Sequence, residues 1–216
     1  MKIKICGLFR EQDIDFVNEA KPDYVGFVFA ESKRQVSPAF ASQLRSRLSE
    51  KLLPVGVFVN APVEDITALY HENTISIAQL HGDEDDDYIT RLKELSASSG
   101  KKKIEVIKTI RNTELEKNTS IIRGADYYLI DSGAGSGKAF NWELLKSAKI
   151  RALKRAKPWF LAGGIDSDNI VQALRHNPYA LDISSGVETN GLKDQKKIVQ
   201  LVSIVRGCAS SQRKII

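Results

Sequence analysis

Cysteine and histidine are both scarce in this 216-residue chain, which has two cysteines and three histidines. Cys6 and Cys208 lie near opposite ends, so the chain has no framework of spaced disulfides, and we expect two reduced thiols. The cysteines and histidines also lack the paired spacing that a structural zinc site uses. The composition therefore excludes a disulfide-rich protein and disfavours a metal site.

Long apolar runs are missing as well. No stretch approaches the roughly 20 apolar residues that a membrane-spanning helix requires, and the first residues do not form the apolar core of a secretory signal. With 42% hydrophobic and 27% charged residues, the composition is that of a globular protein and not of a disordered one. We expect a cytoplasmic protein with no membrane partner.

The net charge is +5, from 32 Lys and Arg residues against 27 Asp and Glu residues. Such a bias suits either a nucleic acid or a small anionic substrate. The basic residues are dispersed, and the lysine run at 101–103 lacks the aromatic residues of a single-strand binding surface. We therefore expect a small anionic ligand and no nucleic acid. The acidic run at 83–87 is predicted to be the solvated start of a helix.

Short apolar runs rich in β-branched residues alternate with stretches of helical periodicity along the whole chain. Most runs are continuous, which is typical of parallel strands buried on both faces. The predicted strands are Lys2–Cys6, Tyr24–Phe29, Pro54–Val59, Ile75–Leu80, Ile104–Thr109, Tyr127–Asp131, Trp159–Ala162 and Ala180–Ser184. The predicted helices are Gln12–Ala20, Pro38–Leu48, Pro62–His71, Asp85–Leu95, Thr113–Ile122, Trp142–Arg155, Ser167–His176 and Lys193–Val205.

This alternation predicts an α/β fold. Eight units in 216 residues favour one (β/α)8 TIM barrel, a single catalytic domain over residues 1–216, with an open doubly wound sheet as the alternative. The active site of such a barrel lies at the carboxyl ends of the strands. In this chain those ends carry polar, reactive or glycine residues, whereas the strand bodies are mostly aliphatic.

Glycine and serine follow the last two predicted strands, as Gly163-Gly164 and Ser184-Ser185-Gly186. Glycines allow backbone N–H groups to approach an anion closely, and serine hydroxyls add donors. The loops after strands seven and eight are the usual phosphate site of these barrels. We predict a phosphate site here; the alternative is that these glycines only make tight turns.

Cys6 and Asp131 end the first and sixth predicted strands, so both can flank a ligand in the mouth of the barrel. They are candidates for proton transfer. A free cysteine has a pKa of about 8.5 and becomes a useful base only where its thiolate is favoured. Lys4 or a helix N-terminus would have to favour it. The alternatives are a buried, inert Cys6 and an Asp131 that caps a helix.

Three other features are less specific. Arg34, in the loop after the second strand, could hold a substrate carboxylate bidentately, although an isolated arginine is more often a solvated surface charge. His81 could orient a substrate or be a hydrogen-bonded core residue. The segment 133–139 is not a P-loop, because Ala139 replaces the Ser or Thr that would hold magnesium; we predict a loop that closes over a ligand.

Several of these segments, taken together, resemble one family. The resemblance covers Lys4–Gly7, Val25–Phe29 with Ser32–Arg34 and Val36–Pro38, Val55–Asn60, Gln79–Gly82, Gly135–Lys138 with Phe140 and Trp142, Leu161–Gly164, Asp182–Glu188, and Gly191 with Lys193 and Asp194. In this order and combination the segments are similar to phosphoribosylanthranilate isomerases of tryptophan biosynthesis.

The resemblance implies a (β/α)8 barrel that converts N-(5-phosphoribosyl)anthranilate to 1-(2-carboxyphenylamino)-1-deoxyribulose 5-phosphate. This Amadori rearrangement needs no cofactor. The family pattern implies Cys6 as general base, Asp131 as general acid and Arg34 as the group that binds the anthranilate carboxylate. It implies phosphate binding by Gly163, Gly164, Ser184, Ser185 and Gly186, and it adds Asp182 to His81 among the candidate substrate-binding residues.

The sequence departs from the family at Ala134, Ala139 and Asn141, where Gly, Thr and Asp are common. Two other functions stay open. A phosphosugar isomerase of histidine biosynthesis would use two carboxylates, which Cys6 disfavours. A non-catalytic barrel that only binds a phosphorylated ligand or a partner protein is disfavoured by the intact Cys6, Asp131 and Arg34. We expect a monomer that binds a small phosphorylated substrate.

Overall fold

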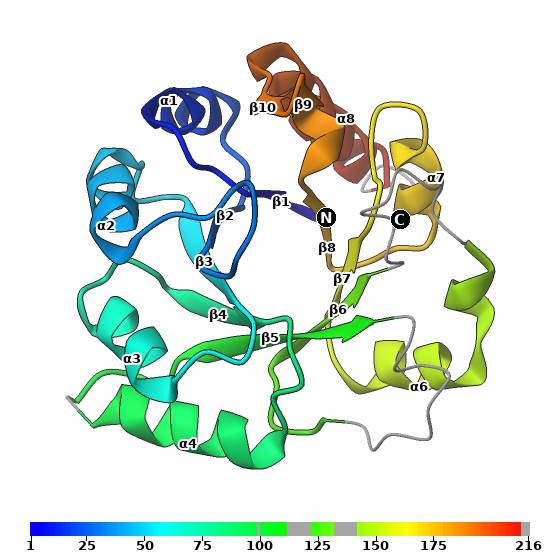
Figure 1. Ribbon diagram of the computed structural model, residues 1–216. Coiled ribbons are helices and arrows are strands. Elements are labelled where there is room, and N and C mark those ends of the chain that lie inside the picture. Colours follow the sequence, from blue (N-terminus) through cyan, green and yellow to red (C-terminus); the bar gives the residue numbers. More distant parts are fainter. Residues whose placement is uncertain (99, 112–121, 132–141, 213–216) are drawn as a thin grey trace.

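The computed structural model describes residues 1–98, 100–111, 122–131 and 142–212. Eight parallel strands form a closed barrel in which each strand pairs with the next and β8 pairs with β1 (Figure 1). The strands are β1 (Lys2–Cys6), β2 (Tyr24–Val28), β3 (Leu53–Phe58), β4 (Ile77–Leu80), β5 (Glu105–Arg111), β6 (Tyr127–Asp131), β7 (Trp159–Ala162) and β8 (Ala180–Ile183). The predicted barrel is confirmed, and the open sheet is wrong.

Helices surround this barrel. They are α1 (Glu11–Ala20), α2 (Pro38–Arg47), α3 (Val63–His71), α4 (Asp86–Ala97), α6 (Ala148–Ala156), α7 (Ile170–Arg175) and α8 (Gln195–Gln212). The helices α1 and α8, from opposite ends of the chain, pack side by side and complete the ring (Figure 1). Within the described ranges, no helix has both the length and the apolar character to cross a membrane. The predicted helix Thr113–Ile122, apart from its last residue, and the predicted loop 133–139 lie outside the described residues.

Two predicted helices differ from the structure. The stretch Trp142–Arg155 is a short 3-10 helix, Trp142–Lys146, followed by α6, because the Ser147 hydroxyl accepts a hydrogen bond from the Ile150 N–H and starts a new helix. The last helix does not begin at Lys193. That residue belongs to a two-stranded hairpin of β9 (Glu188–Thr189) and β10 (Leu192–Lys193), which the sequence analysis missed.

The barrel interior changes character along its axis. Its amino-terminal end is filled by aromatic rings, with Tyr24 and Phe160 5.5 Å apart and Tyr127 and Tyr179 5.4 Å apart between ring centroids. Lys2 of β1 lies over the Tyr24 ring, at the amino-terminal end of the barrel interior. Because side chains alternate between the two faces of a strand, Lys4 and Cys6 lie on the same face as Lys2, further along the barrel axis. The apolar filling thus gives way to polar side chains toward the carboxyl ends of the strands.

The acidic run at 83–87 is only partly solvated, contrary to the prediction. Asp85 caps α4 by accepting a hydrogen bond from the Tyr88 N–H at 2.8 Å. Glu84, by contrast, is buried, and its carboxylate pairs with the buried ammonium of Lys108 at 2.9 Å. The same carboxylate accepts the N–H of Asn60, so one buried ion pair joins β5 to the segments that follow β3 and β4.

We expect Lys108→Met to lower the free energy of unfolding by about 3–5 kcal/mol, because it leaves the Glu84 carboxylate buried without a counter-charge. Urea denaturation measures this change. Lys146→Met, which removes an exposed lysine paired with Glu143, is the control, with a loss of about 1 kcal/mol or less. Equal losses in the two variants would contradict the assigned importance of the buried pair.

Candidate active site

A cavity of about 420 Å³ opens at the carboxyl ends of the barrel strands. Every predicted site residue except Gly186 lines it, and these residues come from six different strands or the loops that follow them. The predicted residues are Cys6, Arg34, His81, Asp131, Gly163, Gly164, Asp182, Ser184 and Ser185, and the others include Val28, Val57, Gln79, Leu129, Ala162 and Ile165. The structure therefore brings together groups that are up to 179 positions apart in the sequence, from Cys6 to Ser185.

The thiol of Cys6 lies beside a buried ammonium group. Lys4 Nζ is 3.4 Å from Cys6 Sγ, and it donates hydrogen bonds to Gln79 Oε1 at 2.5 Å and to Asp182 Oδ2 at 2.9 Å. The Lys4 side chain is fully buried. Since residues i and i+2 of a strand face the same side, β1 itself sets the ammonium beneath the thiol.

Burial raises the pKa of the Cys6 thiol, and the positive charge of Lys4 acts most strongly against that rise. The Asp182 carboxylate reinforces the rise, and the Lys193 ammonium opposes it. Burial would lower the pKa of Lys4, but Asp182 and Cys6 outweigh burial and the pKa of Lys4 is raised. Lys4 therefore stays positively charged, and its charge favours the thiolate form of Cys6.

Asp131 ends β6 and faces the same cavity as Cys6. His81, which follows β4, lies next to it, with 3.7 Å between His81 Nε2 and Asp131 Oδ2. The other ring nitrogen of His81 is 3.3 Å from the Thr109 hydroxyl and 3.5 Å from Gln79 Nε2. Both side chains are partly exposed to the cavity, so His81 is not a core residue and can contact a ligand or hold Asp131.

Arg34 is not a freely solvated charge. Its guanidinium makes a bidentate ion pair with Glu188, with Nε–Oε1 and Nη2–Oε2 distances of 2.7 Å each. The hydrogen bonds to Glu188 raise the pKa of Arg34. The side chain crosses Gly7, where a Cβ atom would lie 2.5 Å from Arg34 Cδ. Glycine at position 7, with a φ of 79°, therefore makes room for Arg34 at the cavity wall.

The loops after β7 and β8 meet closely. Gly163 and Gly164 have positive φ angles of 99° and 62°, which glycine adopts without strain. A Cβ atom at Gly186 would lie 1.9 Å from the carbonyl oxygen of Ile165. Gly186 thus lets one loop pack against the other, although it does not itself line the cavity. The Ser184 hydroxyl donates to the carbonyl oxygen of Cys6 at 3.1 Å and ties the pair of loops to β1.

The carboxylate of Asp182 offers the cavity a hydrogen-bond acceptor. One carboxylate oxygen pairs with Lys4, and the other, Oδ1, has no hydrogen-bond partner among the described residues. The side chain is only 8% exposed and lines the cavity. A buried acceptor without a partner is costly, so it fits a donor that arrives with a ligand, such as a sugar hydroxyl.

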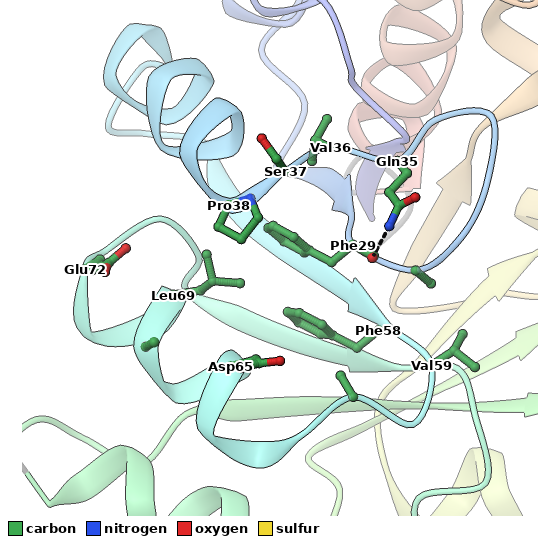
Figure 2. A pocket seen from close by; sticks show the side chains of 13 residues that line it. Phe29, Gln35, Val36, Ser37, Pro38, Phe58, Val59, Asp65, Leu69 and Glu72 are labelled. Atoms are coloured by element: carbon green, nitrogen blue, oxygen red, sulfur yellow. Dashed lines mark hydrogen bonds between the residues drawn. The ribbon is translucent and has the colours of Figure 1, made fainter.

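A second, largely apolar groove of about 640 Å³ adjoins the cavity between α2 and α3 (Figure 2). The rings of Phe29 and Phe58 stack in it with 5.0 Å between centroids. Gln35 Nε2 donates to the carbonyl oxygen of Phe29 at 3.0 Å (Figure 2). Gln35 lines this groove and the preceding Arg34 lines the cavity, so the hydrogen bond from Gln35 ties the loop that carries Arg34 to the end of β2.

The sequence indicated Lys4 as one group that could favour the Cys6 thiolate, and the structure confirms that the Lys4 ammonium lies beside the thiol. The signal was its spacing, because residues i and i+2 of a strand share a face. Gln79, Glu188 and Lys193 are further polar residues of the site to which the sequence assigned no role. For Glu188 and Lys193 no such signal existed. Their ion pair, 2.6 Å long, is formed across the short hairpin of β9 and β10.

A family profile and the similar sequences point to one family. Residues 3–204 match the profile of the N-(5'-phosphoribosyl)anthranilate (PRA) isomerase family. A protein of that name from Endomicrobium trichonymphae is 47% identical over 211 residues, which cover 95% of this chain and 98% of the relative.

Two solved structures are similar over the whole barrel. A phosphoribosylanthranilate isomerase in complex with reduced 1-(o-carboxyphenylamino)-1-deoxyribulose 5-phosphate superimposes with a TM-score of 0.77 at 30% identity, covering 96% of this chain and 99% of the other. The dimeric enzyme of Thermotoga maritima, solved as engineered monomers, gives a TM-score of 0.76 at 30% identity, with the same shares covered.

We expect the pH dependence of Cys6 alkylation by iodoacetamide to report these charges, since the thiolate is the form that reacts. With the exposed Cys208 replaced by Ser, Lys4→Met moves the midpoint to higher pH, because it removes the nearest positive charge. Asp182→Asn moves it to lower pH, because the ammonium then has the thiolate as its one anionic neighbour in this cluster. Shifts in the same direction for both variants would contradict the assigned electrostatics.

Proposed function

The chain belongs to the N-(5'-phosphoribosyl)anthranilate isomerase family, and from that premise we propose how its site works. The reaction is the Amadori rearrangement of N-(5-phosphoribosyl)anthranilate to 1-(2-carboxyphenylamino)-1-deoxyribulose 5-phosphate in tryptophan biosynthesis. We propose Cys6 as the general base and Asp131 as the general acid. The observation that carries this proposal is the buried Lys4 ammonium, 3.4 Å from Cys6 Sγ, beneath a cavity that Asp131 also lines.

Asp131 acts first in this proposal. Its carboxyl group donates a proton to the furanose ring oxygen, the bond between that oxygen and C1 breaks, and C1 becomes a protonated Schiff base with the anthranilate nitrogen. The Schiff base withdraws electrons from C2 and makes the C2 proton acidic. The position of His81 beside Asp131 supports its role in holding the carboxyl group toward the cavity.

Cys6 acts second. Its thiolate removes the C2 proton, and the electron pair moves to give an enolamine between C1 and C2. The enolamine then gains a proton at C1 and loses the proton of the C2 hydroxyl, which yields the ketone. Return of the C1 proton from Cys6 and of the hydroxyl proton to Asp131 restores both groups, so the cycle needs no external oxidant or reductant.

Substrate binding is divided between the two sides of the cavity. The glycines and serines that line the cavity after β7 and β8 hold the phosphate through backbone N–H groups and the Ser185 hydroxyl, since the Ser184 hydroxyl donates to the carbonyl oxygen of Cys6. Arg34, on the opposite loop, binds the anthranilate carboxylate, and the unpartnered Asp182 Oδ1 accepts a sugar hydroxyl. Anchoring both ends of the substrate leaves C1 and C2 between Cys6 and Asp131.

We expect Cys6→Ala and Asp131→Asn each to lower kcat by about 10²–10⁴-fold, the usual contribution of a positioned acid or base. The loss of substrate fluorescence during turnover measures the rate. Cys208→Ala and Asp15→Asn are the matched controls, because both residues are exposed and Asp15 only pairs with Arg47 on the surface. If either site variant kept the kcat of the unsubstituted enzyme, the substituted residue would not have its proposed catalytic role.

We further propose that the chain acts as a single-domain monomer in the cytoplasm. One barrel supplies all the proposed groups, and a catalytic Cys6 thiol requires a reducing compartment. Since one relative is dimeric, sedimentation equilibrium is the direct check. A mass of 24.0 kDa is expected, and twice that mass would contradict the proposal.

A further inference from the structure

Three charged side chains form a continuous chain of ion pairs at the edge of the cavity. Arg34 pairs with both carboxylate oxygens of Glu188, and Lys193 Nζ binds Glu188 Oε1 at 2.6 Å. Lys193 is fully buried, the Glu188 side chain is 7% exposed and that of Arg34 is 30% exposed. The triad of Arg34, Glu188 and Lys193 carries one net positive charge, and Arg34 alone of the three lines the cavity.

The hairpin after β8 fixes this triad in place. Glu188 of β9 and Lys193 of β10 are direct partners in the hairpin, whose turn uses Asn190 and Gly191 with positive φ angles of 55° and 77°. Lys193 Nζ also donates to the carbonyl oxygen of Ser184 at 2.9 Å. The position of Glu188 is thereby coupled to the end of β8, where the proposed phosphate loop begins.

Glu188 occupies only one edge of the Arg34 guanidinium. The ion pair uses Nε and one hydrogen of Nη2, and Nη1 has no hydrogen-bond partner in the described parts of the chain. A guanidinium presents five N–H donors in a planar fork, so the second edge, formed by Nη1 and Nη2, can still bind another carboxylate bidentately. The first carboxylate fixes the plane in which the second one must lie.

Glu188 stays ionised in this setting. Burial would raise the pKa of Glu188, but Arg34 and Lys193 outweigh it and hold the pKa below the usual value. Burial lowers the pKa of Lys193, with Glu188 acting against that change. The contact between Arg34 and Glu188 is therefore a charge-assisted pair with little freedom, and not an exposed surface pair of small energy.

We propose that Glu188 is a positioning residue for substrate specificity: it holds one edge of Arg34 so that the other edge faces the carboxylate of the N-aryl group. The inference rests on the proposed role of Arg34 and deepens it. It predicts that Glu188 acts on the affinity for a carboxylate and not on the proton transfers at C1 and C2. Lys193 supports this role by holding Glu188 against the end of β8.

The test compares two substrates that differ by the carboxylate alone: N-(5-phosphoribosyl)anthranilate and N-(5-phosphoribosyl)aniline. We expect Glu188→Gln to raise KM for the anthranilate substrate by roughly tenfold or more, since a misplaced binding group is costly. KM for the aniline substrate and kcat for both stay close to those of the unsubstituted enzyme. Glu188→Asp, which keeps the charge but shortens the side chain, gives a smaller loss confined to the anthranilate substrate.

Two controls accompany these variants. Glu64→Gln makes the same chemical change in the exposed pair of Glu64 with Arg91 and leaves both substrates unaffected. In an Arg34→Ala background, Glu188→Gln adds nothing further, because Glu188 acts through Arg34.

Three results would overturn the inference. Equal losses with both substrates would make Glu188 a general structural residue. A lower KM for the anthranilate substrate in Glu188→Gln would mean that Glu188 competes with the substrate for Arg34. If Arg34→Ala impairs both substrates equally, the proposed carboxylate role of Arg34 itself fails, and this result separates that failure from a failure of Glu188 alone.

Discussion

The pairing of β1 with β8 is the constraint on which the site depends. The register sets Lys4 opposite Asp182 and Ile5 opposite Ile183, which closes the barrel and joins the two ends of the chain. Because that pairing fixes the backbone, the Lys4 ammonium meets the Asp182 carboxylate and sits beneath the Cys6 thiol. The same closure brings the Ser184 hydroxyl to the carbonyl oxygen of Cys6. The Lys4 charge, the Cys6 thiol and the proposed phosphate loop are thus held by the same pair of strands.

Buried charges surround these strands, and each is paired. The three pairs are Lys4 with Asp182, Lys108 with Glu84, and Lys193 with Glu188, and in each pair at least one partner lies near the carboxyl end of a strand or in the segment that follows one. Burying such pairs gives little net stability, because desolvation offsets the attraction. Their effect is to hold neighbouring loops in one arrangement, so that the groups facing the cavity need little reorganisation when a substrate binds. The amino-terminal end of the barrel, filled by Tyr24, Phe160 and other rings, has no such groups to position.

The sequence predicted the architecture well because it depends on local patterns. Continuous apolar runs and helical periodicity located every strand of the barrel to within a few residues. The site residues predicted at the ends of those strands, except Gly186, line the cavity. What it could not predict depends on tertiary contacts. Glu84 belongs to an acidic run that the sequence predicts to be solvated. Only the folded chain shows that Lys108 lies beside Glu84. In the sequence Arg34 has no evident partner, and only the folded hairpin places Glu188 next to it. Only the folded chain shows that the missing Cβ of Gly186 leaves room for the carbonyl oxygen of Ile165.

In the proposed mechanism, Cys6 and Asp131 both exchange protons with one bound sugar phosphate. A crystal structure of this chain with the reduced product analogue would show whether both groups reach that ligand. The proposed mechanism predicts that Cys6 Sγ contacts C2 of the analogue. It also predicts a carboxylate oxygen of Asp131 on the other side of the sugar chain, within about 2.6–3.2 Å of a ligand oxygen or one water away. The phosphate would lie against Gly163, Gly164 and Ser185. The mechanism would be contradicted if the analogue bound with its phosphate at those loops while Cys6 or Asp131 lay out of reach of C1, C2 and their oxygens.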